Sequence, residues 1–427
     1  MKFPLGLKRI RNAEKYLGKE VVKDVKKAKK TVGPGVITGG ADNDPAGIVT
    51  YTIVGATTGY VLLWLMFIIT PMLIVVQEMA SRVALVKRKG LASVIKEHYG
   101  VNTAKIVMIV LIIANIATIG ADIAGISSVM GMITGISWVW FIIPLTLVIW
   151  YIILFQSYKS IRRILLGLAF LMGIYIISAL LAKPEWTSIA SGFVPHFNFS
   201  FVFLAAAVGM IGTTISPYIL FWQASEELEE KKPALRMKTM ETDTIIGMTW
   251  SNIVSVFIII ASAAVLFGTG IFIETPEQAA IALQPLAGQW AYLLFAIGIL
   301  IVGFLAIPVL AGSTAYAVSE TFGWKEGLDK KVSKAKGFYA VITLSFLVGI
   351  GLAFSPVNPF HFLFYTQILN GLLMPFLVLL LFFMCNNRKI MGCYVNSKLK
   401  NIITIALLVI LGFLDTVLIL QVIEAVV

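Results

Sequence analysis

Long apolar runs separated by short polar segments dominate the chain. A helix needs about 20 apolar residues to cross a hydrocarbon core of about 30 Å. The runs have this length, and they lack the short alternating segments of a membrane barrel. We therefore predict an all-α integral membrane protein with eleven transmembrane helices, near residues 33–55, 58–86, 104–132, 138–157, 161–182, 199–224, 243–269, 289–316, 338–355, 361–384 and 401–423.

Composition supports this class and charge sets the predicted orientation. The chain is 59% hydrophobic and 13% charged, with mean hydropathy +0.91, which no soluble domain matches. The net charge of +12 could suggest a nucleic-acid partner, but the 34 Lys and Arg residues lie before the first span and in alternate loops, with Lys183 as the exception. The positive-inside rule then places the amino terminus in the cytoplasm and the carboxy terminus outside the plasma membrane. The charge reflects topology in a lipid bilayer, and no nucleic acid is expected.

Domain organisation is simple. Residues 1–30 carry 11 Lys and Arg and no apolar core of a signal peptide, so they are predicted to form a basic cytoplasmic segment. Residues 31–427 then form one membrane domain. No feature requires a second copy of the chain, and a monomer is compatible with the sequence.

Two predicted spans contain an interruption. The first is GGADNDPAGI (Gly39–Ile48) and the second is MIGTTISPYILF (Met210–Phe221). Their prolines, Pro45 and Pro217, lie 217 − 45 = 172 residues and five spans apart. Because five is odd, two repeats of five spans must be inverted relative to each other. This pattern predicts a LeuT-type 5+5 inverted repeat (about 31–182 and 195–384) plus an extra helix (401–423), with the substrate bound between the broken helices one and six.

The residues at the two breaks predict a cation site. Asp44 lies at the first break, and Thr213, Thr214 and Ser216 lie at the second. A carboxylate at mid-membrane is costly and usually functional, and oxygen donors suit a hard cation. A proline can also interrupt a helix for packing alone, and Pro217 by itself does not decide between the two.

Other polar residues have less certain roles. Asp42 is either a pathway residue or a charge solvated in an inner vestibule, and both alternatives stay open. Glu78 has Arg82 four residues later, which favours an ion pair within one helix. We predict that the remaining pathway residues are Asn43, Asp122, Tyr218 and Gln367.

Three segments, in this order, resemble the Nramp family of divalent metal transporters over nearly the whole membrane domain. They are GPGVITGGADNDPAG (Gly33–Gly47), QEMASRVALV (Gln77–Val86) and GTTISPYILFWQ (Gly212–Gln223). The departures from the family motifs are similar to those of the bacterial Nramp-related magnesium transporters. The resemblance implies that the transported metal is a substrate and that no cofactor is needed.

The departures concern the metal ligands. The family motif Asp-Pro-Gly-Asn, whose Asp and Asn bind metal, is matched here by Asp44, Pro45, Ala46 and Gly47. The motif Ala-x-x-Met-Pro-His is matched by Thr213, Ser216, Pro217 and Tyr218. An amide ligand and a thioether ligand are therefore missing. A thioether favours transition metals, so its loss predicts a site that accepts Mg²⁺, partly hydrated, and also Mn²⁺.

The proton-coupling residues of the family are also mostly missing. Proton-driven members have an Asp and a Glu three residues later in span three, a His after the span-six proline, and arginine in span nine. This chain has Asp122, but then Gly125 and Tyr218, and no Lys or Arg inside 338–355. The predicted function is import of Mg²⁺ or Mn²⁺ by alternating access without proton coupling.

Four other functions are alternatives to this prediction. A proton-coupled Mn²⁺ or Fe²⁺ symporter is the main alternative, and a sodium-coupled symporter of organic substrates would not explain Asp44. A sensor or scaffold would need a signalling domain that the loops cannot hold. An enzyme is not expected, because no nucleophile and base or Cys/His ligand set occur together.

Overall fold

The computed structural model describes residues 33–155, 172–229 and 237–426, and every regular element in these ranges is helical. Eight helical segments are long and apolar enough to cross a membrane, and Val139–Phe155 is a shorter apolar helix. The all-α prediction is confirmed for these residues. The helices in chain order are α2 (Pro34–Ala41), α3 (Pro45–Thr58), α4 (Leu63–Lys87), α5 (Leu91–Tyr99), α6 (Val101–Thr134), α7 (Val139–Phe155), α9 (Ile174–Leu181), α10 (Trp186–Gly192), α11 (Phe201–Thr214), α12 (Pro217–Glu229), α13 (Met237–Leu266), α14 (Pro276–Ala280), α15 (Gln284–Ala287), α16 (Ala291–Phe322), α17 (Lys336–Ala353), α18 (Pro359–Asn386), α19 (Arg388–Met391) and α20 (Lys398–Val426).

The predicted spans map onto these helices with two differences. The first predicted span consists of two short helices, α2 and α3, and neither alone is long enough to cross. The fifth, 161–182, lies largely outside the described residues, which show only α9 in that region. The predicted segment 1–30 also lies outside them. The count of eleven therefore stays a prediction.

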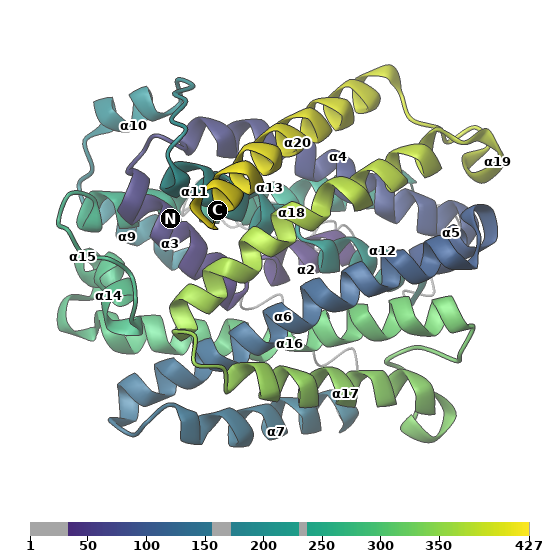
Figure 1. Ribbon diagram of the computed structural model, residues 1–427, viewed down its shortest axis with the longest axis horizontal. Coiled ribbons are helices and arrows are strands. Elements are labelled where there is room, and N and C mark those ends of the chain that lie inside the picture. The colour runs from purple at the N-terminus through teal and green to yellow at the C-terminus, as the bar shows by residue number, and fades with distance from the viewer. Residues whose placement is uncertain (1–32, 156–171, 230–236, 427) are drawn as a thin grey trace, which may run out of the picture.

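The longer helices pack as two groups with short helices between them. Helices α6, α7, α16 and α17 lie side by side on one side of the molecule (Figure 1). Helices α3, α4, α11 and α13 form the other side, and α18 packs against α3, α6, α11 and α20. The short helices α2 and α12 lie in the interior between these groups (Figure 1).

Both breaks have local causes in the sequence. Asp42 closes α2, and Asp44 is the N-cap of α3, with Pro45 at its first position, where proline is favoured. Helix α11 ends at Thr214, and Pro217 begins α12. Since the residue before a proline disfavours helical geometry, Ser216 remains outside both helices. The two predicted interruptions are confirmed.

Helix α2 is held against α13 by contacts that leave no room for side chains. An added Cβ on Gly39 would lie 2.3 Å from the Gly247 carbonyl oxygen, and one on Gly247 would lie 2.2 Å from the Gly35 carbonyl oxygen. The Asp243 carboxylate accepts the backbone N–H groups of Gly33 and Gly35, each at 2.7 Å. These bonds satisfy amides that the start of a helix leaves free.

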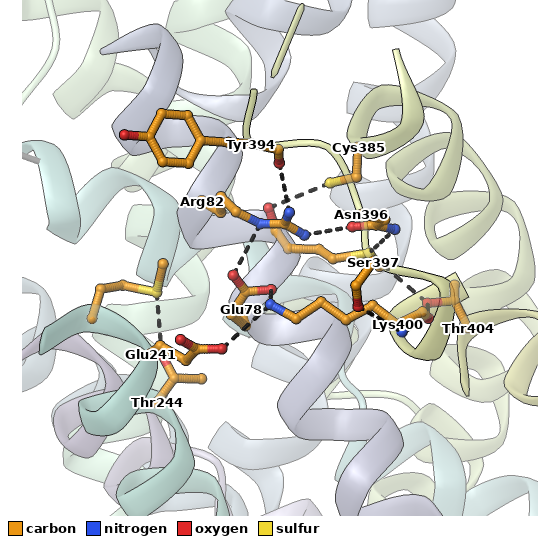
Figure 2. Close-up of polar contacts among 12 residues, drawn as sticks. Glu78, Arg82, Glu241, Thr244, Cys385, Tyr394, Asn396, Ser397, Lys400 and Thr404 are labelled. Carbon is orange, nitrogen blue, oxygen red and sulfur yellow. Dashed lines mark hydrogen bonds and ion pairs between the residues drawn. The ribbon is translucent and has the colours of Figure 1, made fainter. Parts of the chain in front are cut away.

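An ion-pair cluster joins α4 to α20 and α13 (Figure 2). Arg82 Nε lies 2.9 Å from Glu78 Oε1, which confirms the predicted pair. Lys400 Nζ lies 3.0 Å from Glu78 Oε2 and 3.4 Å from Glu241 Oε1. Arg82 also donates to the Tyr394 carbonyl at 2.6 Å. The cluster fixes the end of α4 relative to the last helix.

Candidate cation site

The two carboxylate oxygens of Asp44 have different surroundings at the first break. Its Oδ1 accepts the Gly47 backbone N–H at 2.5 Å and so caps α3. Its Oδ2 is buried and finds no hydrogen-bond partner among the described residues. Helix capping explains one carboxylate oxygen, and the other is available to a cation.

Thr213 lies directly across from Asp44, next to Gly47. A Cβ added to Gly47 would meet Thr213 Oγ1 at 2.8 Å and Asp44 Oδ1 at 3.0 Å. Thr213 Oγ1 is buried and makes no hydrogen bond within the described part of the chain. The two predicted breaks are thus brought together, and the Thr213 hydroxyl fills space that a side chain at position 47 would need.

The other two predicted ligands of the second break are already engaged. The Ser216 hydroxyl donates to the carbonyls of Gly212 and Thr213, each at 2.9 Å, and keeps its lone pairs free. The Thr214 hydroxyl bonds to the Met210 carbonyl at 2.7 Å and to the Tyr51 hydroxyl at 2.9 Å. Thr213 and Ser216 are therefore better placed than Thr214 to supply oxygen to a cation at Asp44.

Tyr218 and Gln367 border the site. The Tyr218 hydroxyl donates to the Ala41 carbonyl at 3.2 Å and lies near the Asp44 carboxylate. Gln367 Oε1 accepts from Asn370 at 3.0 Å, and its Nε2 finds no described partner. An added Cβ on Gly212 would lie 2.0 Å from the Gln367 carbonyl oxygen, so α18 contacts α11 directly beside Thr213.

Asp122 faces the first break from α6. It is fully buried, lies beside the Ala46 amide, and has no hydrogen-bond partner for either oxygen in the described ranges. One turn further along α6, a Cβ on Gly125 would lie 2.8 Å from Leu363 Cδ1. The position that follows Asp122 by three residues is therefore packed against an apolar side chain.

Asp42 does not lie in a solvated vestibule, and that alternative was wrong. The residue is 2% exposed because α13 covers it, and its Oδ2 accepts the Ser251 hydroxyl at 2.8 Å. Asn43 donates to Ser251 at 3.0 Å and accepts from Ser255 at 3.0 Å. Both residues thus point to α13.

The sequence analysis missed the α13 partners of the first broken helix. Asp243, Gly247, Ser251 and Ser255 recur every four residues and so lie on one face of α13. That spacing was visible in the sequence. An unbroken helix, however, carries no local signal that marks these residues as partners of the first break.

All the predicted ligand side chains are buried. Asp44, Thr213 and Ser216 are each 1% exposed, and Thr214 and Asp122 are 0% exposed. In this structure these side chains are therefore closed to solvent.

Comparison with known proteins decides the family. The sequence model of the family described as Natural resistance-associated macrophage protein-like (Nramp) matches residues 35–421, which is nearly the whole described chain. The chain belongs to the Nramp family. It is 24% identical over 399 residues to the divalent metal cation transporter MntH of Bacillus subtilis (strain 168), with 91% of each chain covered. An Nramp protein 2 homologue of Dictyostelium discoideum is 24% identical over 387 residues, covering 87% of this chain and 60% of that one.

Solved structures agree in fold. A manganese transporter of Eremococcus coleocola superposes with a TM-score of 0.71 at 18% identity, covering 90% of this chain and 84% of that one. The inward-facing Mhp1 transporter gives a TM-score of 0.52 at 14% identity, covering 92% and 91%. This Nramp protein therefore has the LeuT-type fold predicted from its two breaks, and it is a multi-pass membrane transporter of divalent metal cations.

Proposed function

We propose that this Nramp protein imports Mg²⁺, and also Mn²⁺, across the plasma membrane as a partly hydrated ion and without proton coupling. The observation that carries the proposal is the pairing of Asp44 with Thr213 at the junction of the two breaks. Both present a buried oxygen with no partner among the described residues. Mg²⁺ is commonly bound through one or two carboxylates while it keeps several waters.

The oxygen donors support a hard cation. The family motif has Met where Ser216 lies and Asn where Gly47 lies. Met66 Sδ lies 3.9 Å from Thr214 Oγ1 at the second break, and Thr214 also bonds to the Met210 carbonyl. Without sulfur in the ligand set, the site loses the chemical preference for transition metals over Mg²⁺.

The surroundings of Asp122 support the absence of proton coupling. A proton relay needs a titratable acceptor within hydrogen-bond reach. The next residue on that face of α6 is Gly125, which packs on Leu363, and Tyr218 replaces the family's histidine. Asp122 then serves to attract the cation.

The membrane potential is sufficient to drive import. A divalent cation gains about 4.6 kcal/mol per 100 mV of inside-negative potential, twice the value of a single charge. This free energy supports accumulation of Mg²⁺ without a coupled ion.

A proton-coupled Mn²⁺ or Fe²⁺ symporter is the second candidate. Two similarities favour this candidate. The relatives are named divalent metal cation transporter MntH, and the solved structure with a similar fold is that of a manganese transporter. Asp122, which this chain retains, would then take part in proton transfer.

Proteoliposomes loaded with separate metal and pH dyes distinguish the two candidates. Under an inside-negative potential we expect Mg²⁺ and Mn²⁺ to enter without internal acidification, and each to compete with the other. The matched control is Gly351→Ala, because that glycine has open space around it on α17. Stoichiometric acidification with Mn²⁺, together with indifference to excess Mg²⁺, would establish the proton-coupled symporter instead.

A further inference from the structure

Basic side chains gather where α4 and α18 end, at the end of the molecule that the positive-inside rule places in the cytoplasm. Lys87 is the last residue of α4, and Arg88 and Lys89 follow it. Arg388 and Lys389 begin α19, just after α18. All of them are exposed except Lys87, which is partly buried. We call these five residues the basic corner.

Packing between helices holds the two parts of the basic corner together. Helix α19 packs against α4, and α4 contacts α5 at the same end of the molecule (Figure 1). The Cys385 thiol near the end of α18 donates to the Met79 carbonyl of α4 at 3.7 Å. Tyr99, the last residue of α5, lies beside Asn387. Cations from distant parts of the sequence are therefore presented on one surface.

Most of the positive charge at the basic corner is not neutralised. Lys89 Nζ lies 2.6 Å from Glu97 Oε2, and Glu97 also lies near Lys87. Within the described ranges, Arg88, Arg388 and Lys389 form no ion pair with a carboxylate. Such a surplus of positive charge attracts anions.

The backbone of Arg88 gives a second observation. This residue ends α4 in the left-handed conformation, with φ 51°. Glycine is the usual residue there, because it has no Cβ that the conformation would crowd. An arginine is locally unfavourable at such a position, and the observation favours a role for its side chain.

Apolar surface lies next to the basic corner on the membrane side. Phe383, in the last turn of α18, is 52% exposed, and Ile106, in the second turn of α6, is 53% exposed. Helices α6 and α18 pack against each other, and a cavity of about 20 Å³ between them, α5 and α12 has an apolar described lining that includes Leu91 and Leu380. A ligand that matches both surfaces has an anionic head and apolar chains.

We propose that the basic corner binds an anionic phospholipid of the surrounding bilayer. Arg88, Arg388 and Lys389 bind its phosphate, and its acyl chains lie along α6 and α18. The corner follows directly on two membrane-spanning helices, so it lies at the depth of the lipid headgroups, where basic clusters attract anionic lipids. The inference goes beyond the proposed function and does not depend on which metal is transported.

Titration of phosphatidylglycerol or phosphatidylcholine into the purified full-length protein, followed by native mass spectrometry, tests the site. We expect the parent to bind phosphatidylglycerol at least about tenfold more tightly. Arg88→Gly should lower this preference about fivefold without loss of thermal stability, because glycine suits the left-handed conformation. The triple variant Arg88→Gly, Arg388→Gln and Lys389→Gln should lose the preference.

A matched control separates a local site from the general attraction of a basic protein for anions. The triple variant Lys325→Gln, Lys331→Gln and Lys334→Gln removes the same charge from exposed positions between α16 and α17, at the same end of the molecule (Figure 1). It should keep the preference of the parent. Thermal melting checks that every variant is folded.

Glycerol 3-phosphate carries the phosphate without acyl chains, and we expect it not to displace the lipid. Displacement would indicate a site for soluble anions and would overturn the proposal. The proposal is also overturned if the parent binds both lipids equally, if the folded basic-corner variant keeps its preference, or if the control variant loses as much.

Discussion

Asp44 caps a helix with one carboxylate oxygen and offers the other to the proposed cation. Its Oδ1 caps α3 through Gly47, while its buried Oδ2 has no partner in the described ranges. An alanine at this position would remove the cap and the charge together. Asparagine is as good an N-cap as aspartate, so Asp44→Asn removes the charge and keeps the cap.

We therefore expect Asp44→Asn to reduce Mg²⁺ and Mn²⁺ uptake at least about 100-fold while the free energy of unfolding changes by less than about 1 kcal/mol. Uptake into liposomes and thermal melting in detergent measure the two quantities. Asp44→Ala should lose uptake and stability together. Parent-like uptake by the asparagine variant would refute the assignment of Asp44 as the metal ligand.

The second residue-scale prediction concerns selectivity. Thr213 Oγ1 occupies space that an asparagine at position 47 would need, so Gly47→Asn alone should clash. Adding Thr213→Ala, which matches the family's alanine, removes the shorter of the two close contacts and leaves Asp44 Oδ1 at 3.0 Å, and Ser216→Met supplies the thioether. We expect the triple variant to shift the preference for Mn²⁺ over Mg²⁺ by about tenfold or more. Competition uptake measures this ratio, and an unchanged ratio in a folded triple variant would contradict the ligand assignment.

At the scale of elements, α2 approaches α13 closely enough for their backbones to touch. Gly35, Gly39 and Gly247 bring the two backbones into contact, and Asp243 caps the start of α2. Small residues at such interfaces are typical of helix pairs in membranes. The position of Asp42 and Asn43 against Ser251 depends on this contact.

Gly247→Ala should disturb this packing, because its Cβ would lie 2.2 Å from the Gly35 carbonyl oxygen. Backbone cannot move aside as a side-chain tip can, so we expect a loss of about 1–3 kcal/mol in stability and at least tenfold in uptake. Gly298→Ala is the control, since nothing lies within 4 Å of that position on α16. Equal melting temperatures and uptake in the two variants would show that the α2–α13 contact is not required.

At the scale of the whole molecule, helix ends far from the site meet in polar clusters. One joins α4 to α20 through Arg82 and Lys400 (Figure 2). Another surrounds a cavity of about 230 Å³ at the ends of α12 and α16, lined in part by Glu229, Glu320 and Glu326. Burial, and then the nearby Glu320 carboxylate, raise the pKa of Glu326 to about 8.

This shift predicts a pH dependence of stability. Between about 4.5 and about 8 the folded protein binds more protons at Glu326 than the unfolded chain does, so its stability should fall as pH rises through this range. Glu326→Gln should remove that part of the decline, and should melt higher than the parent at pH 9 but not at pH 4. The exposed Glu277→Gln serves as control. A parallel pH profile for the parent and Glu326→Gln would contradict the assignment.

The sequence by itself determined the class, the breaks and the residues at them. Apolar runs must cross lipid as helices, and Asp44-Pro45 and Ser216-Pro217 interrupt two of them through local capping and proline geometry. The ion pair of Glu78 and Arg82 was also predictable, because a spacing of four residues places both on one helix face. These features depend on neighbours in the chain.

Only the tertiary structure decided which of those residues face one another. It brought Thr213 to Asp44, directed Thr214 to Tyr51, buried Asp42 against Ser251, and packed Gly125 on Leu363. Each of these contacts joins helices that are distant in the sequence, and small changes in helix rotation would rearrange them. Hydrophobic pattern fixes which segments are helices, whereas the packing of one helix on another fixes where their polar side chains point.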